Sequence, residues 1–325
     1  MTSQRRVVIA LGGNAMTGPD GSATPGAQRA AIAVAAGHVA AVVATGAEVV
    51  VTHGNGPQVG NLLVKNELAA HEVPPVPLDW NVAQTQGTIG FTVVDELDAA
   101  LAARGLDQRT AALVTRTLVD AEDPGFAEPT KPVGRFLPRE QAQRFVELGQ
   151  RWEDRGEKGW RRVVASPEPR SVLDSPAIRA LAAAGFVVVC AGGGGIPVED
   201  DDRDGAALRG VEAVIDKDLT AALMAAELGA DTLVIATDVD HVMVDFGTPD
   251  ARPLGRVTVD ELRAHAAAGQ FARGSMGPKV DAALRFVAGG PGRRAVITSL
   301  EHIAGAVADD AVGTVINRAT NQEES

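Results

Sequence analysis

Short apolar runs rich in β-branched residues alternate along this chain with longer helix-like segments, and glycine-rich turns join several of them. Runs of strand length lie at residues 7–11, 48–52, 111–114, 186–191, 232–237 and 294–298. Such runs are typical of strands that are buried on both faces, as in a parallel sheet. The alternation therefore predicts an α/β fold with helices on both faces of a parallel sheet, and it argues against an all-β fold or a helical bundle.

Helices are predicted between these strands, most clearly at residues 27–45, 219–228 and 279–287. Gly46 and Gly229 directly follow the first two, and the pair Gly289 and Gly290 ends the third. Glycine readily adopts the left-handed conformation that ends many helices. Residues 120–168 break the alternation, because they hold five prolines among charged residues and are too long for a simple connection. We interpret them as a protruding subdomain or lid. The acidic run at residues 199–204 is interpreted as a solvated loop, with a cation site as the alternative.

Composition excludes several classes of function. The 325 residues are 45% hydrophobic, which is enough for a packed core. A formal net charge of −12 repels polyanions, so no nucleic-acid partner is expected. Cys190 is the single cysteine, so no disulfide can form within the chain and a reducing cytoplasm is expected. The N-terminus leads directly into a predicted strand, and no apolar run of about 18 residues is apparent, so we expect no membrane association.

Three glycine-rich turns follow predicted strands, at residues 12–15, 54–57 and 192–195. In open α/β sheets the carboxyl ends of the strands form the ligand-binding edge, and glycine lets backbone N–H groups approach an oxyanion. The alternative is that tight turns simply need glycine. The chain has no G-x-x-x-x-G-K-[ST] motif, and Gly54, Gly56 and Gly60 do not have the spacing of a dinucleotide-binding fingerprint. The turns therefore predict an anion site that is neither a P-loop nor a Rossmann site.

Lysine is scarce, since 25 of the 30 cationic residues are arginine. Lys65 and Lys158 lie in polar contexts and are interpreted as solvated. Lys217 stands between Asp216 and Asp218, a pattern suited to a fixed ammonium group beside a phosphate, although an exposed charged turn is the alternative. Lys279 stands at the start of a predicted helix, where a lysine is unfavourable unless an anion binds there.

Six motifs in their order along the chain resemble those of the carbamate kinases, which belong to the amino-acid-kinase superfamily. They lie at residues 10–15, 53–63, 129–134, 192–197, 210–218 and 274–279. The resemblance extends from about residue 7 to residue 316 and implies an open αβα sandwich with a mostly parallel central sheet. It also implies an acceptor-binding lobe at residues 1–185, with residues 120–168 as its protruding lid, and a nucleotide-binding lobe at residues 186–325. A homodimer is the usual assembly of the family.

The same resemblance implies roles for individual residues. The catalytic set comprises Lys217, Lys279, Asp218 and Lys131. Lys217 and Lys279 neutralise the charge of the moving phosphoryl group, and Asp218 orients them. Lys131 reaches in from the lid. Groups that cradle the phosphoryl group and the acceptor lie in the first two turns: Gly12, Gly13, Asn14, Gly54, Asn55 and Gly56. The nucleotide-binding set comprises Gly193, Gly194, Asp216, Thr237, Asp238, His241, Ser275 and Met276. Mg²⁺ is expected on the nucleotide phosphates, with no direct protein ligand.

The chain departs from the family pattern near the nucleotide base, because it contains no tyrosine. His241 stands where relatives often have an aromatic ring, so either His241 stacks on adenine with Met276 on the other face, or both are packing residues. Trp80 is interpreted as a core or interface residue and Cys190 as a small buried apolar residue.

The expected reaction is reversible phosphoryl transfer between carbamoyl phosphate plus ADP and carbamate plus ATP. It requires Lys217 and Lys279 to meet the glycine turns in one cleft. Two alternatives remain from the sequence: another acyl-phosphate-forming kinase on the same scaffold, and a nucleotide or anion sensor without activity. The sequence leaves open which direction the cell uses, and whether the pathway belongs to arginine metabolism, allantoin degradation or the use of another nitrogen source.

Overall fold

The central feature is an eight-stranded sheet in the order β15-β17-β16-β12-β1-β2-β9-β3. The computed structural model describes residues 5–18, 21–147, 149–201, 207–272, 274–308 and 312–318. The strands of this sheet are β1 (Arg6–Leu11), β2 (Glu48–His53), β3 (Thr110–Ala112), β9 (Val187–Val189), β12 (Thr232–Thr237), β15 (Arg256–Thr258), β16 (Arg294–Ser299) and β17 (Thr314–Asn317). All neighbours pair in parallel except β16 and β17. Each of the six predicted runs forms a strand of this sheet.

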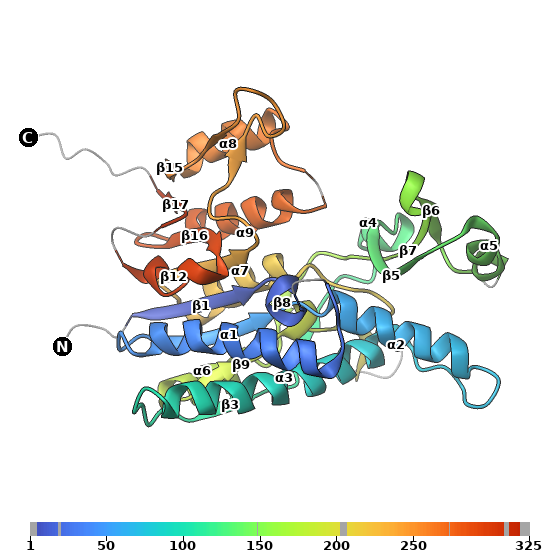
Figure 1. The fold of residues 1–325 in the computed structure, drawn as a ribbon, viewed down its shortest axis with the longest axis horizontal. Helices are drawn as coiled ribbons and strands as arrows, with labels where there is room; N and C mark the ends of the chain where they lie inside the picture. Colours follow the sequence, from blue (N-terminus) through green and yellow to red (C-terminus); the bar gives the residue numbers. More distant parts are fainter. Residues whose placement is uncertain are drawn as a thin grey trace, which may run out of the picture.

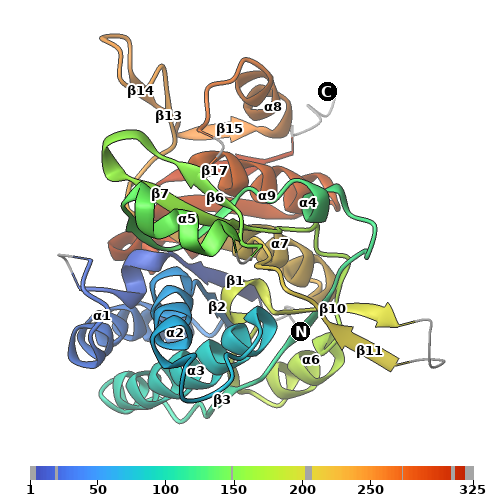
Figure 2. The same cartoon turned by 90° about the vertical axis from the view of Figure 1, so that its right-hand side faces the viewer.

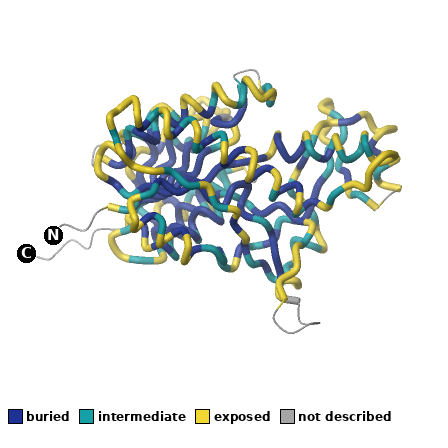
Figure 3. Tube along the Cα trace, turned by 90° about the horizontal axis from the view of Figure 1, so that it is seen from below, coloured by how far each residue is buried: buried dark blue, intermediate teal, exposed yellow. Residues whose placement is uncertain are grey.

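Helices cover both faces of the sheet, so the molecule has three layers (Figure 1). One layer contains α1 (Pro25–Val43) and α3 (Leu78–Ala102), and the other contains α6 (Ser175–Ala183), α7 (Lys217–Leu228) and α9 (Met276–Ala288). Successive side chains of a strand point to opposite faces, so Val7 and Ile9 pack with the first layer, whereas Val8 and Ala10 pack with the second. The buried trace in Figure 3 is accordingly concentrated around the sheet. The predicted αβα sandwich is confirmed.

Two expectations about helices differ from the structure. The helix predicted at residues 279–287 begins earlier, at Met276, because Pro278 falls within the first turn, where no N–H group needs an intrahelical partner. By length and composition α1 could span a membrane, contrary to the expectation that no such run exists. Seven residues along α1, from Ile32 to Val43, are buried against the sheet and α3, as in a core helix.

Residues 120–168 project from the sandwich, as predicted (Figure 1). They fold around a three-stranded antiparallel sheet of β5 (Lys131–Leu137), β6 (Trp152–Asp154) and β7 (Trp160–Val164), with α4 (Pro124–Ala127) and α5 (Arg139–Glu147) beside it. Leu137, Ala142 and Trp152 form a small separate core. A second cluster, which includes Val133 and Val164, joins this projecting unit to α2 (Gly56–Ala69) and α3. We call the unit the lid subdomain.

A smaller sheet, in the order β11-β10-β4-β8, lies beside the sandwich (Figure 2). Its strands are β4 (Arg116–Leu118), β8 (Ser171–Val172), β10 (Ile196–Asp201) and β11 (Ala207–Gly210). The interpretation of residues 199–204 as a loop is wrong for residues 199–201, which end β10, and residues 202–204 lie outside the described part of the chain. Glu199 is buried and paired with Arg209, which explains why an acidic residue is tolerated in the strand.

Candidate active site

The first two glycine turns meet at one edge of the sheet because β1 and β2 are parallel neighbours. A β-carbon at Gly12 would lie 2.8 Å from the carbonyl oxygen of Ala236 at the end of β12, so glycine is required there. A β-carbon at Gly54 would lie 3.4 Å from Cδ of Lys217 and 3.6 Å from the backbone nitrogen of Gly13. The two turns and the stem of Lys217 are therefore in close contact.

Lys217 and Lys279, which are far apart in the sequence, share one carboxylate. Nζ of Lys217 lies 2.5 Å from Oδ1 of Asp218, and Nζ of Lys279 lies 3.0 Å from Oδ2 of the same residue. The Asp218 side chain is 4% exposed and each lysine side chain 15%. This arrangement brings the predicted lysines to the glycine turns in one site, and it rules out the alternative of an exposed charged turn.

Burial and charge act on this triad in opposite directions. Burial alone would raise the pKa of Asp218, but the adjacent ammonium groups of Lys217 and Lys279 outweigh burial and lower that pKa to about 2. Burial, reinforced by the charge of Lys279, lowers the pKa of Lys217 although Asp218 opposes the change. With all three groups charged, two cations share one anion, so the site carries an excess positive charge that a phosphoryl group can neutralise.

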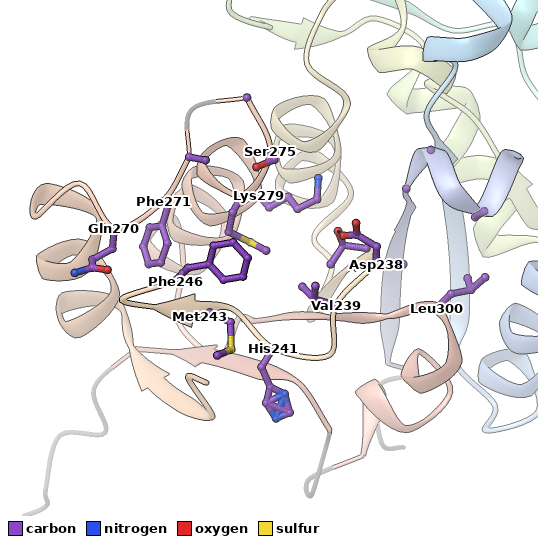
Figure 4. A pocket seen from close by; sticks show the side chains of 18 of the residues that line it. Asp238, Val239, His241, Met243, Phe246, Gln270, Phe271, Ser275, Lys279 and Leu300 are labelled. Carbon is purple, nitrogen blue, oxygen red and sulfur yellow. Dashed lines mark hydrogen bonds between the residues drawn. The ribbon is translucent and has the colours of Figure 1, made fainter. Parts of the chain in front are cut away.

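A cavity of about 760 Å³ opens beside Lys279 of this triad (Figure 4). Gly12, Gly13 and Lys279 line it where it meets the triad. Five residues of the predicted nucleotide-binding set also line it: Thr237, Asp238, His241, Ser275 and Met276. Nδ1 of His241 is buried there without a hydrogen-bond partner in the described part of the chain. We call this space the first cavity.

Sequence reasoning missed the aromatic residues of the first cavity. Phe246 and Phe271 both line it, together with Met243, and Figure 4 shows the two rings at one end of the cavity. Phe246 is 79% exposed, and Asp245 before it has a positive φ of 53°. The sequence does contain a signal for Phe246, which stands in a turn between Asp245 and Gly247. Core packing does not require an aromatic side chain in such a turn, so its presence there indicates another role.

The third glycine turn has a different surrounding from the one predicted. A β-carbon at Gly192 would collide with the ring of His53, and one at Gly193 would collide with the side-chain amide of Asn55. The hydroxyl groups of Thr117 and Thr220 donate to the carbonyl oxygen of Gly194. The third turn thus packs against the side chains of the second turn and supports them. Neither Gly193 nor Gly194 is among the residues that line the first cavity.

The side chains of His53 and Asn55 stabilise the second turn. Burial lowers the pKa of His53 to about 4, so its ring is neutral at pH 7, and Nδ1 lies 2.9 Å from the carbonyl oxygen of Gly54. The side-chain nitrogen of Asn55 donates to the hydroxyl group of Thr85 at 2.9 Å. The structure describes the backbone of Asn14 in the first turn, whereas its side chain lies outside the described part.

A second cavity, of about 1030 Å³, lies between α2 and the lid subdomain. Gly56 at the start of α2 lines it, as do Thr85 and the cationic residues Lys65, Arg135 and Arg161. Lys279 of the triad lines the first cavity, whereas no residue of the triad lines the second. Gly54, which contacts Lys217, lies two residues before Gly56 of the second cavity, so the triad approaches the second cavity at this turn, a point that we call the junction. Lys65 and Lys158 are exposed, as interpreted from sequence.

The lid subdomain contributes a lysine near the triad. Nζ of Lys131, the first residue of β5, lies 2.7 Å from Oδ2 of Asp216. Asp216, which was predicted to bind nucleotide, directs its carboxylate to this lysine and to the start of α7, and it is not among the residues that line the first cavity. Trp80 is 61% exposed and is therefore not a core residue. Cys190 is buried, as predicted, and burial raises the pKa of its thiol.

Comparisons with known proteins agree with this geometry. A model of the amino acid kinase family matches residues 5–299. Carbamate kinase 1 of Enterococcus faecium is 41% identical over 315 residues, which cover 97% of this chain and 99% of that protein. The carbamate kinase of Thermococcus kodakarensis is 44% identical over 321 residues, with 97% and 99% coverage.

A solved structure gives the same result for the fold. The carbamate kinase of Giardia lamblia bound to AMP-PNP matches with a TM-score of 0.90 and 38% identity, covering 98% of this chain and 100% of that one. Identity of this extent over nearly the full length, together with the shared fold, shows that the chain is a kinase of the amino acid kinase family and belongs there with the carbamate kinases.

Proposed function

We propose that this kinase catalyses reversible phosphoryl transfer between carbamoyl phosphate plus ADP and carbamate plus ATP. The observation that carries the proposal is the triad of Lys217, Asp218 and Lys279, which lies against the glycine turns at the junction of two cavities. Phosphoryl transfer needs two reactants in line and positive charge around the moving group. A nucleotide reaching this junction from one cavity and a small acceptor reaching it from the other meet that requirement.

The first cavity is the proposed nucleotide site. Apart from the first glycine turn, its lining residues all come from residues 236–300, which supports nucleotide binding by the lobe at residues 186–325. Phe246 and Phe271 supply ring faces for the adenine, so a stacking residue is available although the chain has no tyrosine. The relative from Giardia lamblia, which binds AMP-PNP, supports an adenine nucleotide as substrate.

The second cavity is the proposed acceptor side. All of its lining residues fall between residues 21 and 161, which supports acceptor binding by the lobe at residues 1–185. The N-terminus of α2 faces it, and the cationic side chains of Arg135 and Arg161 belong to its wall. Both features favour a small anion such as carbamoyl phosphate. In this proposal residues 120–168 act as a lid that shields the acyl phosphate from water.

Each residue of the triad has a distinct role in the proposed transfer. Lys217 and Lys279 neutralise charge on the equatorial oxygens of the phosphoryl group as it moves. Asp218 holds both ammonium groups in place, since each of its oxygens accepts from one of them. Backbone N–H groups of Gly12 and Gly13 bind the phosphoryl oxygens, whereas the N–H group of Gly54 donates to the carbonyl oxygen of Leu11 and holds the second turn against the first. The transfer is direct, and the protein forms no covalent intermediate.

Mg²⁺ is proposed as a partner of the nucleotide. The described residues contain no cluster of three metal-ligating side chains, and both oxygens of Asp218 are occupied by lysines. These residues fit a cation that is carried on the nucleotide phosphates better than one held by protein ligands. Bound in that way, Mg²⁺ would reduce the negative charge that the lysines must neutralise.

The assembly and location of the protein are also proposals. Trp80 and Phe91 are 61% and 54% exposed, and their spacing places them on the same face of α3. A second copy of the chain covering this face would remove two exposed aromatic side chains from water, which supports a homodimer. The cytoplasm is the proposed location because the single cysteine is buried as a thiol.

The test of the proposed function is ATP formation from ADP and carbamoyl phosphate, with and without Mg²⁺. We expect Mg²⁺-dependent ATP formation with carbamoyl phosphate. In the opposite direction, phosphorylation of acetylglutamate or aspartate by ATP would identify another acyl-phosphate-forming kinase. Nucleotide binding without ATP formation would identify a sensor.

A further inference from the structure

The carboxylate of Asp216 makes two separate sets of contacts. Its Oδ1 accepts from the backbone N–H groups of Asp218 and Leu219, at 2.9 Å and 3.4 Å, and thereby caps the N-terminus of α7. Its Oδ2 accepts from Nζ of Lys131 at 2.7 Å. The side chains of Asp216 and Lys131 are 15% and 31% exposed, so water screens this ion pair only in part.

These contacts join two parts of the molecule that are distant in the sequence. Lys131 begins β5 of the lid subdomain, and the capped turn of α7 begins with Lys217 and Asp218 of the triad. We propose that Asp216 is a positioning residue, which holds Lys131 at the acceptor side of the triad and so couples the position of the lid to the binding of carbamoyl phosphate. The proposal rests on the proposed function.

The groups around Asp216 explain why the pairing with Lys131 matters. Asp281 on α9 also faces this region, and its pKa is raised first by burial and then by the charge of Asp216. Lys217 is the other charged neighbour, but its ammonium group is bonded to Asp218. Lys131 therefore offsets the charge of Asp216, and its loss would leave Lys217 as the cation beside Asp216 and strengthen the repulsion between Asp216 and Asp281.

Two further contacts, which involve no charged groups, hold the lid subdomain against α2. A β-carbon at Gly60 of α2 would lie 2.9 Å from Cα of Gly134, so the backbones of α2 and β5 touch. Val133 and Val164 pack in the cluster that contains Val59. These contacts keep the lid subdomain attached to α2 when the ion pair is broken. Removing the charge of Asp216 therefore changes the position of the Lys131 side chain and leaves the fold intact.

The test compares single and double variants of the full-length enzyme. Asp216→Asn removes the charge but keeps the cap, because asparagine caps helices as well as aspartate does. We expect the KM for carbamoyl phosphate to rise about tenfold, with the KM for ADP within about twofold of the wild type. Lys131→Met should raise the same KM at least as much. In the Lys131→Met background, Asp216→Asn should have no further effect, because its partner is already absent.

Asp120→Asn is the matched control. It breaks the ion pair between Asp120 and Arg170 at the base of the same subdomain, where both side chains are at least 40% exposed. This variant should leave both KM values unchanged. Wild-type KM for carbamoyl phosphate in Asp216→Asn, or independent effects of Asp216→Asn and Lys131→Met that multiply in the double variant, would overturn the inference.

Hydrogen exchange tests the inference without any substrate. Asp216→Asn should accelerate amide exchange in β5 and β7 and leave exchange in α1 unchanged, because the ion pair holds the base of the lid. Unchanged exchange in β5 and β7 would overturn the inference even in an active enzyme. A wild-type protein that forms no ATP from carbamoyl phosphate would instead refute the proposed function, so the two failures are distinguishable.

Discussion

Replacing Asp218 by asparagine tests the central electrostatic argument. The substitution keeps the size of the side chain but leaves the ammonium groups of Lys217 and Lys279 without their shared anion. Each pKa unit corresponds to about 1.4 kcal/mol. The lowering of the Asp218 pKa from 3.8 to about 2 therefore corresponds to about 2 kcal/mol in favour of the charged carboxylate in the folded protein. Because the side chain is 4% exposed, solvent screening does not reduce this figure.

The sign of the pH dependence follows from the direction of this change. The folded protein binds a proton on Asp218 less readily than the unfolded chain does, so the stabilisation is fully present above about pH 4 and is lost as pH falls to about 2. Urea unfolding at pH 7 should show that Asp218→Asn is about 2 kcal/mol less stable than the wild type. The difference between the two proteins should shrink as pH falls from about 4 to about 2.

Activity and anion binding complete this test. Turnover of Asp218→Asn should fall by about 10²-fold or more, because the lysines lose the group that holds them. Sulfate should raise the Tm of the variant more than that of the wild type, since an anion replaces the missing charge. Asp174→Asn, which removes one partner of the Arg116 ion pair away from the site, should retain wild-type turnover. Unchanged stability and turnover in Asp218→Asn would refute the reasoning.

Three further predictions concern the two lysines, the base site and the metal. Lys217→Ala or Lys279→Ala should each reduce turnover by roughly 10² to 10³-fold in the ATP-forming assay, and near wild-type turnover in either variant would contradict its role. Phe246→Ala should raise the KM for ADP by about tenfold and leave the KM for carbamoyl phosphate unchanged, since stacking of a base on a ring contributes about 1–3 kcal/mol; an equal rise in both KM values would argue against a base site at Phe246. EDTA should abolish ATP formation and excess MgCl₂ should restore it, whereas full activity in EDTA would remove Mg²⁺ from the proposal.

The fold was largely predictable because six of the eight strands of the main sheet carry their own sequence signal. Strands such as β1 and β12 are buried on both faces, so they appear in the sequence as continuous apolar runs whatever their partners are. The edge strand β15 and its neighbour β17 were missed because they are only three and four residues long, too short for a clear apolar run. Strand order depends on long-range pairing, which local patterns do not encode.

The site was predictable only in part. Scarcity of lysine drew attention to Lys217 and Lys279, but their meeting at Asp218 depends on how α7 and α9 pack, and the sequence implied it only through resemblance to a family. Phe246 escaped notice because an exposed ring in a turn has no periodicity. The turn at residues 192–195 looked like a phosphate loop, yet its glycines make room for the side chains of His53, Asn55 and Thr117.

The overall negative charge and the proposed anionic substrates are compatible because the relevant charges are local. At physiological ionic strength the Debye length is about 8 Å, so exposed acids elsewhere on the surface are largely screened from the triad. Within the triad two ammonium groups face one carboxylate at 2.5 Å and 3.0 Å, in a site where burial weakens screening. The net charge of −12 then disfavours polyanions at long range, whereas a small phosphorylated molecule that enters the junction meets a positive field. Substrate selection by size and charge thus follows from burying one small cationic site in an acidic protein.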